Sequence, residues 1–384
     1  MIVGGGSKKQ NMKTLKKFVA LMTLAALVAG PAQALAAIST TLTKDGGSGA
    51  APIVLAKWEM YPSATQGDNG RDDRDAYLTQ FESTGIYGDN VEYEVCSIVW
   101  DQDGVGDLAT VGAKVFYPTT ASGASVHPEW GCGLPVSNQF VLTQLTKAEG
   151  IDLVCNQIKT NDNNLVKFNP TAGFAGTEAG LSADWSRMCA GDYELMKGTA
   201  FVYCADTELS YEAPSGDYRV LAFAQDRSGV NGTLENTLQY VPTDALEADF
   251  NKIDYGQVKL QIEKPINGDL DWDALGTNQA TVRNTGNTRI QVGVTQDDMG
   301  FGQFITNEYK VRFDGHVGND QTSINFEPYV LTTLPGELDL SEMDEIDFSI
   351  YVREFPVDHS DTYTGTMTLQ PVRIDHNQCP PTQA

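Results

Sequence analysis

The chain lacks the short motifs that mark the common catalytic classes. Its 384 residues contain no G-x-S-x-G elbow, no H-E-x-x-H and no C-x-x-C pair. The few histidines stand apart from one another in polar segments, at His127, His316, His359 and His376. A hydrolase built on two carboxylates stays as the weakest alternative, because 51 acidic residues bring acid pairs together by chance. We therefore predict a protein that is not an enzyme.

Basic residues are also scarce. There are 26 lysines and arginines against 51 acids, giving a formal charge of −25. Loss of the five lysines in the first 36 residues would bring the charge near −30. Such a field repels nucleic acid and anionic membranes and attracts divalent cations or basic partners.

Long hydrophobic runs are limited to one, FVALMTLAALVAG at residues 18–30. Lysines precede this run and Ala34-Leu35-Ala36 follows it, which is typical of a secretory signal peptide. The alternative is a retained membrane anchor, although the run is short for a span. We expect residues 1–36, an upstream extension and signal peptide, to be removed. The remaining chain would then be secreted or held at the cell surface, without a segment inserted in the membrane.

Cysteine is uncommon, and its use fits an oxidising compartment. The six residues are Cys96, Cys132, Cys155, Cys189, Cys204 and Cys379. Six thiols allow 15 pairings, so the connectivity stays open. We favour two local disulfides as an expectation, Cys132 with Cys155 and Cys189 with Cys204.

Short apolar alternations separated by Gly, Asn and Asp turns run through most of the chain. Examples are Val91-Tyr93-Val95, Val111-Ala113-Val115-Tyr117, Val258-Leu260-Ile262 and Ile346-Phe348-Ile350-Val352. At Ser97 the alternation slips, which indicates a bulge or a strand buried on both faces. ATVRNTGNTRIQVGVTQ predicts two short strands about an Asn-Thr-Gly-Asn turn, whose residues tolerate positive φ.

These patterns predict an all-β protein of two Ig-like antiparallel β-sandwich domains. We place the first at residues 52–242, with a partly helical disulfide-bearing insertion at about 119–196, and the second at 243–376. A flexible arm at 37–51 and a tail at 377–384 would flank them.

Several phrases together resemble a known group of proteins. They include WDQDGVGDLATVGAKVFYP, SGDYRVLAFAQD, VRNTGNTRIQVGVTQDDMGFG, LSEMDEIDFSIYV and YTGTMTL. Over most of residues 55–372 the chain is similar to secreted Ig-like surface proteins of methanogenic and related archaea, whose biochemical role is not established. The resemblance implies an extracellular location and a double sandwich, and it supplies no catalytic residues.

The stretch DQDGVGD, residues 101–107, is a candidate calcium loop. Asp101, Asp103 and Asp107 occupy its first, third and seventh positions, and the carbonyl of Val105 its fifth. The twelfth position is Gly112 instead of a bidentate glutamate. Missing ligands would come from another acidic loop, such as residues 67–75. The alternative is a tight turn with solvated acids, an account that also suits the acid-rich loop at 267–273.

Three further side chains lie in loop-like segments. Trp130 and Trp272 are candidates for stacking on a polysaccharide or another ligand. Asn231 begins the glycosylation sequon NGT.

The functional hypothesis is a secreted structural or adhesive subunit of an envelope layer or extracellular filament. It would be stabilised by calcium if the acidic loop binds this ion, and it would assemble with itself or with surface partners. The arm segment ISTTLTK could add as a strand to a neighbour's sheet. A polysaccharide- or ligand-binding module is the alternative.

Overall fold

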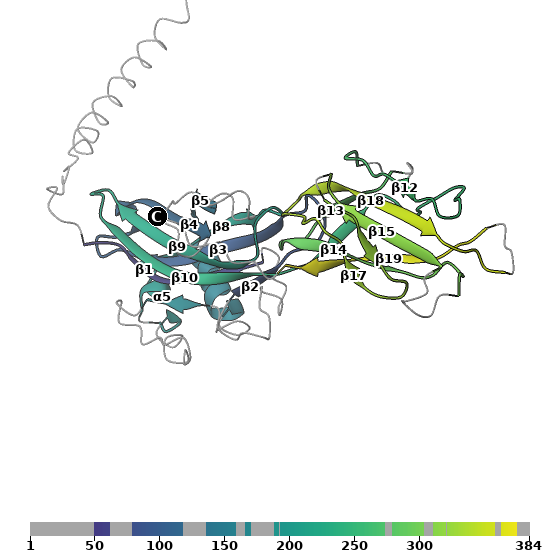
Figure 1. Ribbon diagram of the computed structural model, residues 1–384. Helices are drawn as coiled ribbons and strands as arrows, with labels where there is room; N and C mark the ends of the chain where they lie inside the picture. Colours follow the sequence, from purple (N-terminus) through teal and green to yellow (C-terminus); the bar gives the residue numbers. More distant parts are fainter. Residues whose placement is uncertain are drawn as a thin grey trace, which may run out of the picture. The chain divides into compact units, whose positions relative to one another are not determined.

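The computed structural model describes residues 50–61, 79–117, 136–158, 166–169, 188–191, 193–272, 279–302, 310–319, 321–357 and 362–374 (Figure 1). The signal peptide, the arm up to residue 49, loop 67–75, Trp130, Cys132, Cys379 and the tail lie outside these residues. The described chain is all-β and forms two antiparallel β-sandwiches. Each sandwich consists of its own pair of sheets.

The first sandwich contains two five-stranded sheets, with orders β6-β8-β3-β1-β7 and β2-β10-β9-β4-β5. Its strands are β1 Ile53–Met60, β2 Thr79–Glu82, β3 Val91–Trp100, β4 Leu108–Tyr117, β5 Val136–Val141, β6 Thr143–Gln144, β7 Lys167–Phe168, β8 Ala200–Leu209, β9 Gly216–Asp226 and β10 Asn231–Val241. Neighbouring strands are antiparallel except β2 and β10, which run parallel.

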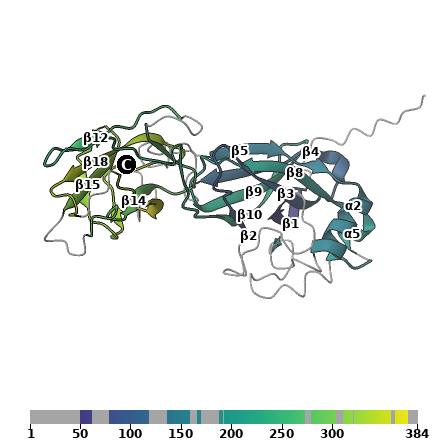
Figure 2. The same cartoon turned by 90° about the vertical axis from the view of Figure 1, so that its right-hand side faces the viewer.

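Strand β3 is buried on both faces, which explains the slip at Ser97. Tyr93 and Val95 belong to the core shared with the facing sheet. Cys96 and Ile98 belong to a second core under the helices α2 Lys147–Ile151, η3 Asp152–Ile158 and α5 Glu194–Lys197 (Figure 2). The β3–β8 ladder is continuous from Val91 to Trp100, whereas the β1–β3 ladder shifts register between Val54 and Ala56 of β1. Double burial of β3 therefore explains the slip, and the irregularity in pairing lies on β1.

The predicted insertion is partly helical, but it also supplies strands to the sheets. A capping box between Thr146 and Glu149 begins helix α2. Strand β5 pairs with β4 along six residues, and β6 and β7 pair with β8 and β1. Part of the segment 119–196 therefore belongs to the sandwich itself and is not an insertion. Short edge strands were missed because their apolar alternation is brief.

The favoured disulfide pairing is wrong. Cys204 bonds to Cys96, and Cys155 bonds to Cys189. Cys96 and Cys204 face each other across the β3–β8 ladder, with Cα atoms 4.2 Å apart, although 108 residues separate them in sequence. Proximity in the sheet decides the pairing, and proximity in sequence does not.

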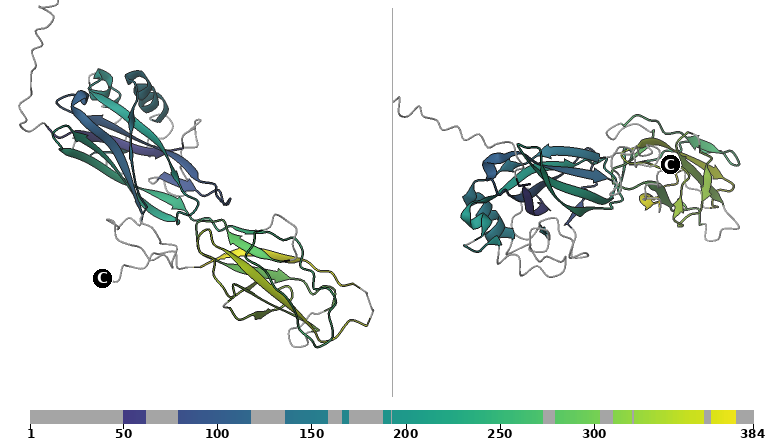
Figure 3. Two further views of the ribbon diagram at one scale, coloured as in Figure 1. Left: turned by 90° about the horizontal axis from the view of Figure 1, so that it is seen from above. Right: turned by 90° about the vertical axis from the view of Figure 1, so that its left-hand side faces the viewer.

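The second sandwich places a sheet of order β11-β13-β18-β15-β16, with β12 also on β18, against the sheet β17-β14-β19 (Figure 3). Its strands are β11 Leu246–Ala248, β12 Lys264–Ile266, β13 Thr281–Asn284, β14 Ile290–Gln296, β15 Val311–Val317, β16 Ile324–Phe326, β17 Thr332–Thr333, β18 Met343–Val352 and β19 Met367–Arg373. The predicted alternation on β18 is confirmed, since Ile346, Phe348, Ile350 and Val352 are all buried.

One prediction for this sandwich is wrong, and the strands predicted about the Asn-Thr-Gly-Asn turn are confirmed as β13 and β14. Residues 258–262 form no strand: Gln261 has a φ of 60°, and Leu260 and Ile262 are exposed. The Asn-Thr-Gly-Asn turn joins β13 and β14, which lie in different sheets. Gly286 does not have positive φ. A Cβ there would lie 2.2 Å from the carbonyl oxygen of Thr243, so close backbone approach requires this glycine.

An acid pair in the first sandwich makes stability depend on pH. Glu94 on β3 lies directly opposite Asp206 on β8. Burial, and then the charge of Asp206, raises the pKa of Glu94 to about 7. Because this pKa exceeds the ordinary value near 4.5, the folded protein holds the proton more tightly than the unfolded chain. The stabilisation is complete below about pH 4.5 and is lost as the pH rises through about 7.

We predict that Asp206→Asn lowers the pKa of Glu94 and raises the free energy of unfolding at pH 8 by up to about 1 kcal/mol, because like charges face each other across the ladder. At pH 4 the gain should vanish. Urea unfolding at both pH values measures the change in the free energy of unfolding. Asp217→Asn, at an exposed position, is the control. An equal effect at pH 4 and pH 8 would contradict the explanation.

Candidate functional site

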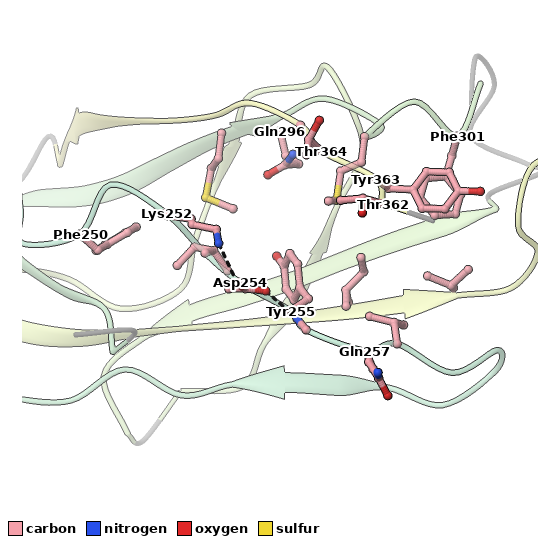
Figure 4. Close-up of a pocket in the computed structure, with 18 of the residues that line it drawn as sticks. Phe250, Lys252, Asp254, Tyr255, Gln257, Gln296, Phe301, Thr362, Tyr363 and Thr364 are labelled. Carbon is pink, nitrogen blue, oxygen red and sulfur yellow. Dashed lines mark hydrogen bonds and ion pairs between the residues drawn. The ribbon is translucent and has the colours of Figure 1, made fainter. Parts of the chain in front are cut away.

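The second sandwich contains a cavity of about 1280 Å³ that lies between β18 and β19 (Figure 4). Residues 250–259, which run as a coil, form one wall. Strand β18 contributes Ile350 and Val352, and β19 contributes Met367 and Leu369. We call this cavity the β19 groove. It is larger than the pockets that usually hold small ligands.

The groove has a mixed polar and apolar lining and carries an aromatic cluster. The rings of Phe301 and Tyr363 have centroids 4.7 Å apart, and those of Phe355 and Tyr363 are 5.7 Å apart. Met299 lies in the same lining. Apolar and aromatic surface of this kind favours contact with apolar side chains.

Strand β19 borders the groove with an open edge. Among the described strands it pairs only with β14. Its side chains alternate between half-buried and exposed, with Met367 and Leu369 half-buried. On the neighbouring strand, Val292 and Val294 are completely buried. The core is therefore incompletely covered at β19, where an additional strand would cover it.

One buried polar group faces the groove. Tyr255 is 7% exposed, and its hydroxyl has no hydrogen-bond partner among the described residues. Burial raises the pKa of Tyr255, so the hydroxyl stays protonated and can donate to a carbonyl oxygen. Lys252 and Asp254 form an ion pair of 2.8 Å in the coil wall (Figure 4).

The groove is suited to binding more than to catalysis. Its described lining contains no histidine, cysteine, serine or glutamate. Asp254 is its one carboxylate among the described residues, and Lys252 and the backbone N–H of Gly256 already bond to it. These described side chains do not form a nucleophile and base pair. Sequence reasoning missed the groove, because its walls come from separate segments with ordinary apolar patterns.

The predicted calcium loop adopts a tight turn. Asp101 Oδ1 accepts the N–H of Asp103 at 2.7 Å, and η1 Val105–Asp107 leads into β4. The carbonyl of Val105 accepts the N–H of Leu108. Asp103 Oδ2 accepts the N–H of Ala50 at 3.1 Å. The tight turn and a metal site are not exclusive alternatives.

The other predicted site residues are dispersed. The guanidinium carbon of Arg283 lies 3.8 Å from the ring centroid of Trp272, so one face of this indole is already covered. Asn231 is exposed at the first residue of β10, directly after the β9–β10 turn. Neither residue contributes to the β19 groove.

Comparisons with known proteins give little guidance. No protein-family model matches the chain, and no curated protein matches it. The chain has 11% identity to a chain in the crystal structure of the CsuC-CsuE chaperone-tip adhesion subunit pre-assembly complex from archaic chaperone-usher Csu pili of Acinetobacter baumannii. The match covers 76% of this chain and 96% of that chain, with a TM-score of 0.24.

A second solved structure is the C-terminal domain of the Streptococcus pyogenes antigen I/II-family protein AspA. It has 13% identity, and the match covers 84% of this chain and 97% of that chain, with a TM-score of 0.19. Both TM-scores are too low to support an argument about function. Within the described residues, no helix is both long enough and apolar enough to span a membrane.

We predict that the β19 groove binds the dye anilinonaphthalene sulfonate, because its apolar walls are accessible. Leu369→Arg should reduce the fluorescence gain at least several-fold, since it places a charge on a wall. Val141→Arg on strand β5 is the matched control, because Val141 is an exposed valine outside the groove. Equal fluorescence in the two variants would contradict the assignment.

Proposed function

We propose that this protein is a non-enzymatic extracellular subunit of a surface layer or filament, in which the second sandwich receives an extended strand from another copy of the chain. The observation that carries the proposal is the apolar groove beside the open edge of β19. Strand addition supplies backbone hydrogen bonds along the edge and places alternate side chains in the groove.

The proposed donor is the arm segment ISTTLTK, residues 38–44. In an extended conformation Ile38, Thr40 and Leu42 share one face. Two apolar residues four positions apart suit an apolar groove, while the threonines favour extended backbone. The protonated hydroxyl of Tyr255 can donate a hydrogen bond to a backbone carbonyl of the added strand.

The last strand of the first sandwich, β10, ends at Val241, and we call the following segment that leads to the second sandwich the linker. Ala50, which directly follows residues 37–49 of the arm, lies at the opposite end of the first sandwich. Ala50 bonds to Asp103 in the β3–β4 turn. The N–H of Arg227 donates to the carbonyl of Asp107 at 2.9 Å, which places this turn beside the β9–β10 turn. Strand β10 then runs from Asn231 at that end to Val241 at the linker.

The groove likewise lies at the end of its sandwich that is remote from the linker. Arg373, the last residue of β19, bonds to Asp244 at 2.8 Å beside the linker. The groove instead uses Met367 and Leu369, at the opposite end of the strand. We propose that the donation takes place between copies. Repeated head-to-tail contacts of this kind generate open filaments.

Location outside the cell is part of the proposal. The two disulfides formed by described residues support folding in an oxidising compartment. The expected signal peptide supports the same location.

We expect the mature chain to form concentration-dependent oligomers that deletion of residues 37–49 abolishes. Light scattering after size exclusion and electron microscopy measure the outcome. In the mature chain that keeps the whole arm, Leu369→Arg should block assembly, whereas Val141→Arg should not. Assembly that survives the deletion would contradict the proposal. A monomer that the arm stabilises equally at all concentrations would instead indicate donation within one chain.

A further inference from the structure

Two aspartates in the first sandwich are buried with incompletely satisfied carboxylates. Asp101 follows strand β3 and is 2% exposed, and Asp226 ends β9 and is 1% exposed. Their Oδ2 atoms have no hydrogen-bond partner among the described residues. The other oxygens are used: Asp226 Oδ1 accepts the Ser228 hydroxyl and the Val230 N–H, both at 2.8 Å.

The two aspartates belong to adjacent turns. Leu108, at the start of β4, is the ladder partner of Asp226. The 2.9 Å bond between Arg227 and Asp107 joins the same two turns. Asp101, Asp103, Asp107 and Asp226 lie in or beside these two adjacent turns, and we call them the acidic turn cluster.

The cluster needs positive charge. Neither Asp101 nor Asp226 has an ion pair with a described lysine or arginine. A buried carboxylate oxygen without donor or cation is strongly unfavourable.

We propose that the acidic turn cluster binds a calcium ion through the Oδ2 atoms of Asp101 and Asp226. Carboxylate oxygens are ligands that this hard cation prefers. Asp103 and Asp107 supply further negative charge. The ligand set differs from the motif in the sequence, because Asp226 enters it and the carbonyl of Val105, which accepts an N–H, leaves it.

The ion would connect the β3–β4 turn to the β9–β10 turn. Asp103 also accepts the N–H of Ala50, so the ion would fix the backbone at the residue that follows residues 37–49 of the arm. This inference goes beyond the proposed function, since the site lies in the first sandwich and does not require assembly.

The test is a thermal melt of the full mature chain in EDTA and in calcium, with calorimetric titration of calcium. We expect calcium to raise the melting temperature. Asp226→Asn should weaken calcium binding at least tenfold and remove the shift. In EDTA the same variant should melt no lower than the native chain, because Asn retains an oxygen acceptor and removes an unpaired buried charge.

Asp217→Asn is the matched control, because Asp217 lies at the other end of β9, is exposed and should leave the calcium response unchanged. Asp101→Asn gives a second comparison if Asp226→Asn does not fold. A melt unaffected by millimolar calcium, or a full calcium response in both Asn variants, would overturn the site. An equal response to magnesium would overturn the assignment to calcium.

Discussion

An open sheet edge beside an uncovered apolar core is the constraint on which the second sandwich depends. A sheet of six strands faces a sheet of three, so the smaller sheet cannot cover the larger one completely. The coil at residues 250–259 forms a wall but leaves the β19 groove accessible. Backbone groups at such an edge attract another strand, and a protein either protects this edge or uses it. We interpret the groove as an edge that is used.

The first sandwich covers its apolar surfaces with elements of its own. Its two sheets have five strands each, and the helices α2, η3 and α5 cover the second face of the sheet that contains β3. Two cross-links hold this arrangement, one across the β3–β8 ladder and one within the helical segment. Lys57 and Glu59, both completely buried on β1, bond to each other and to Asn236 of β10. These cross-links and buried polar bonds join the two sheets and the helical segment of the first sandwich.

The sequence predicts the strands better than it predicts the sites. Alternation identified β3, β4 and β18 because one face of each strand packs on a core. The same pattern failed at residues 258–262, where the coil borders a groove and has no facing sheet. Cys96 and Asp226 were missed as partners because sheet pairing brings together residues that lie far apart in the chain. The acids at Asp101, Asp103 and Asp107 carried a local signal, but their buried partner did not.

Amide hydrogen exchange on the chain lacking residues 37–49, with and without a synthetic peptide of those residues, tests the central claim most directly. The account predicts that the peptide slows exchange along β19 and leaves the edge strand β5 unchanged. Unchanged exchange at β19 with saturating peptide, or equal protection at β5, would contradict strand addition in the groove.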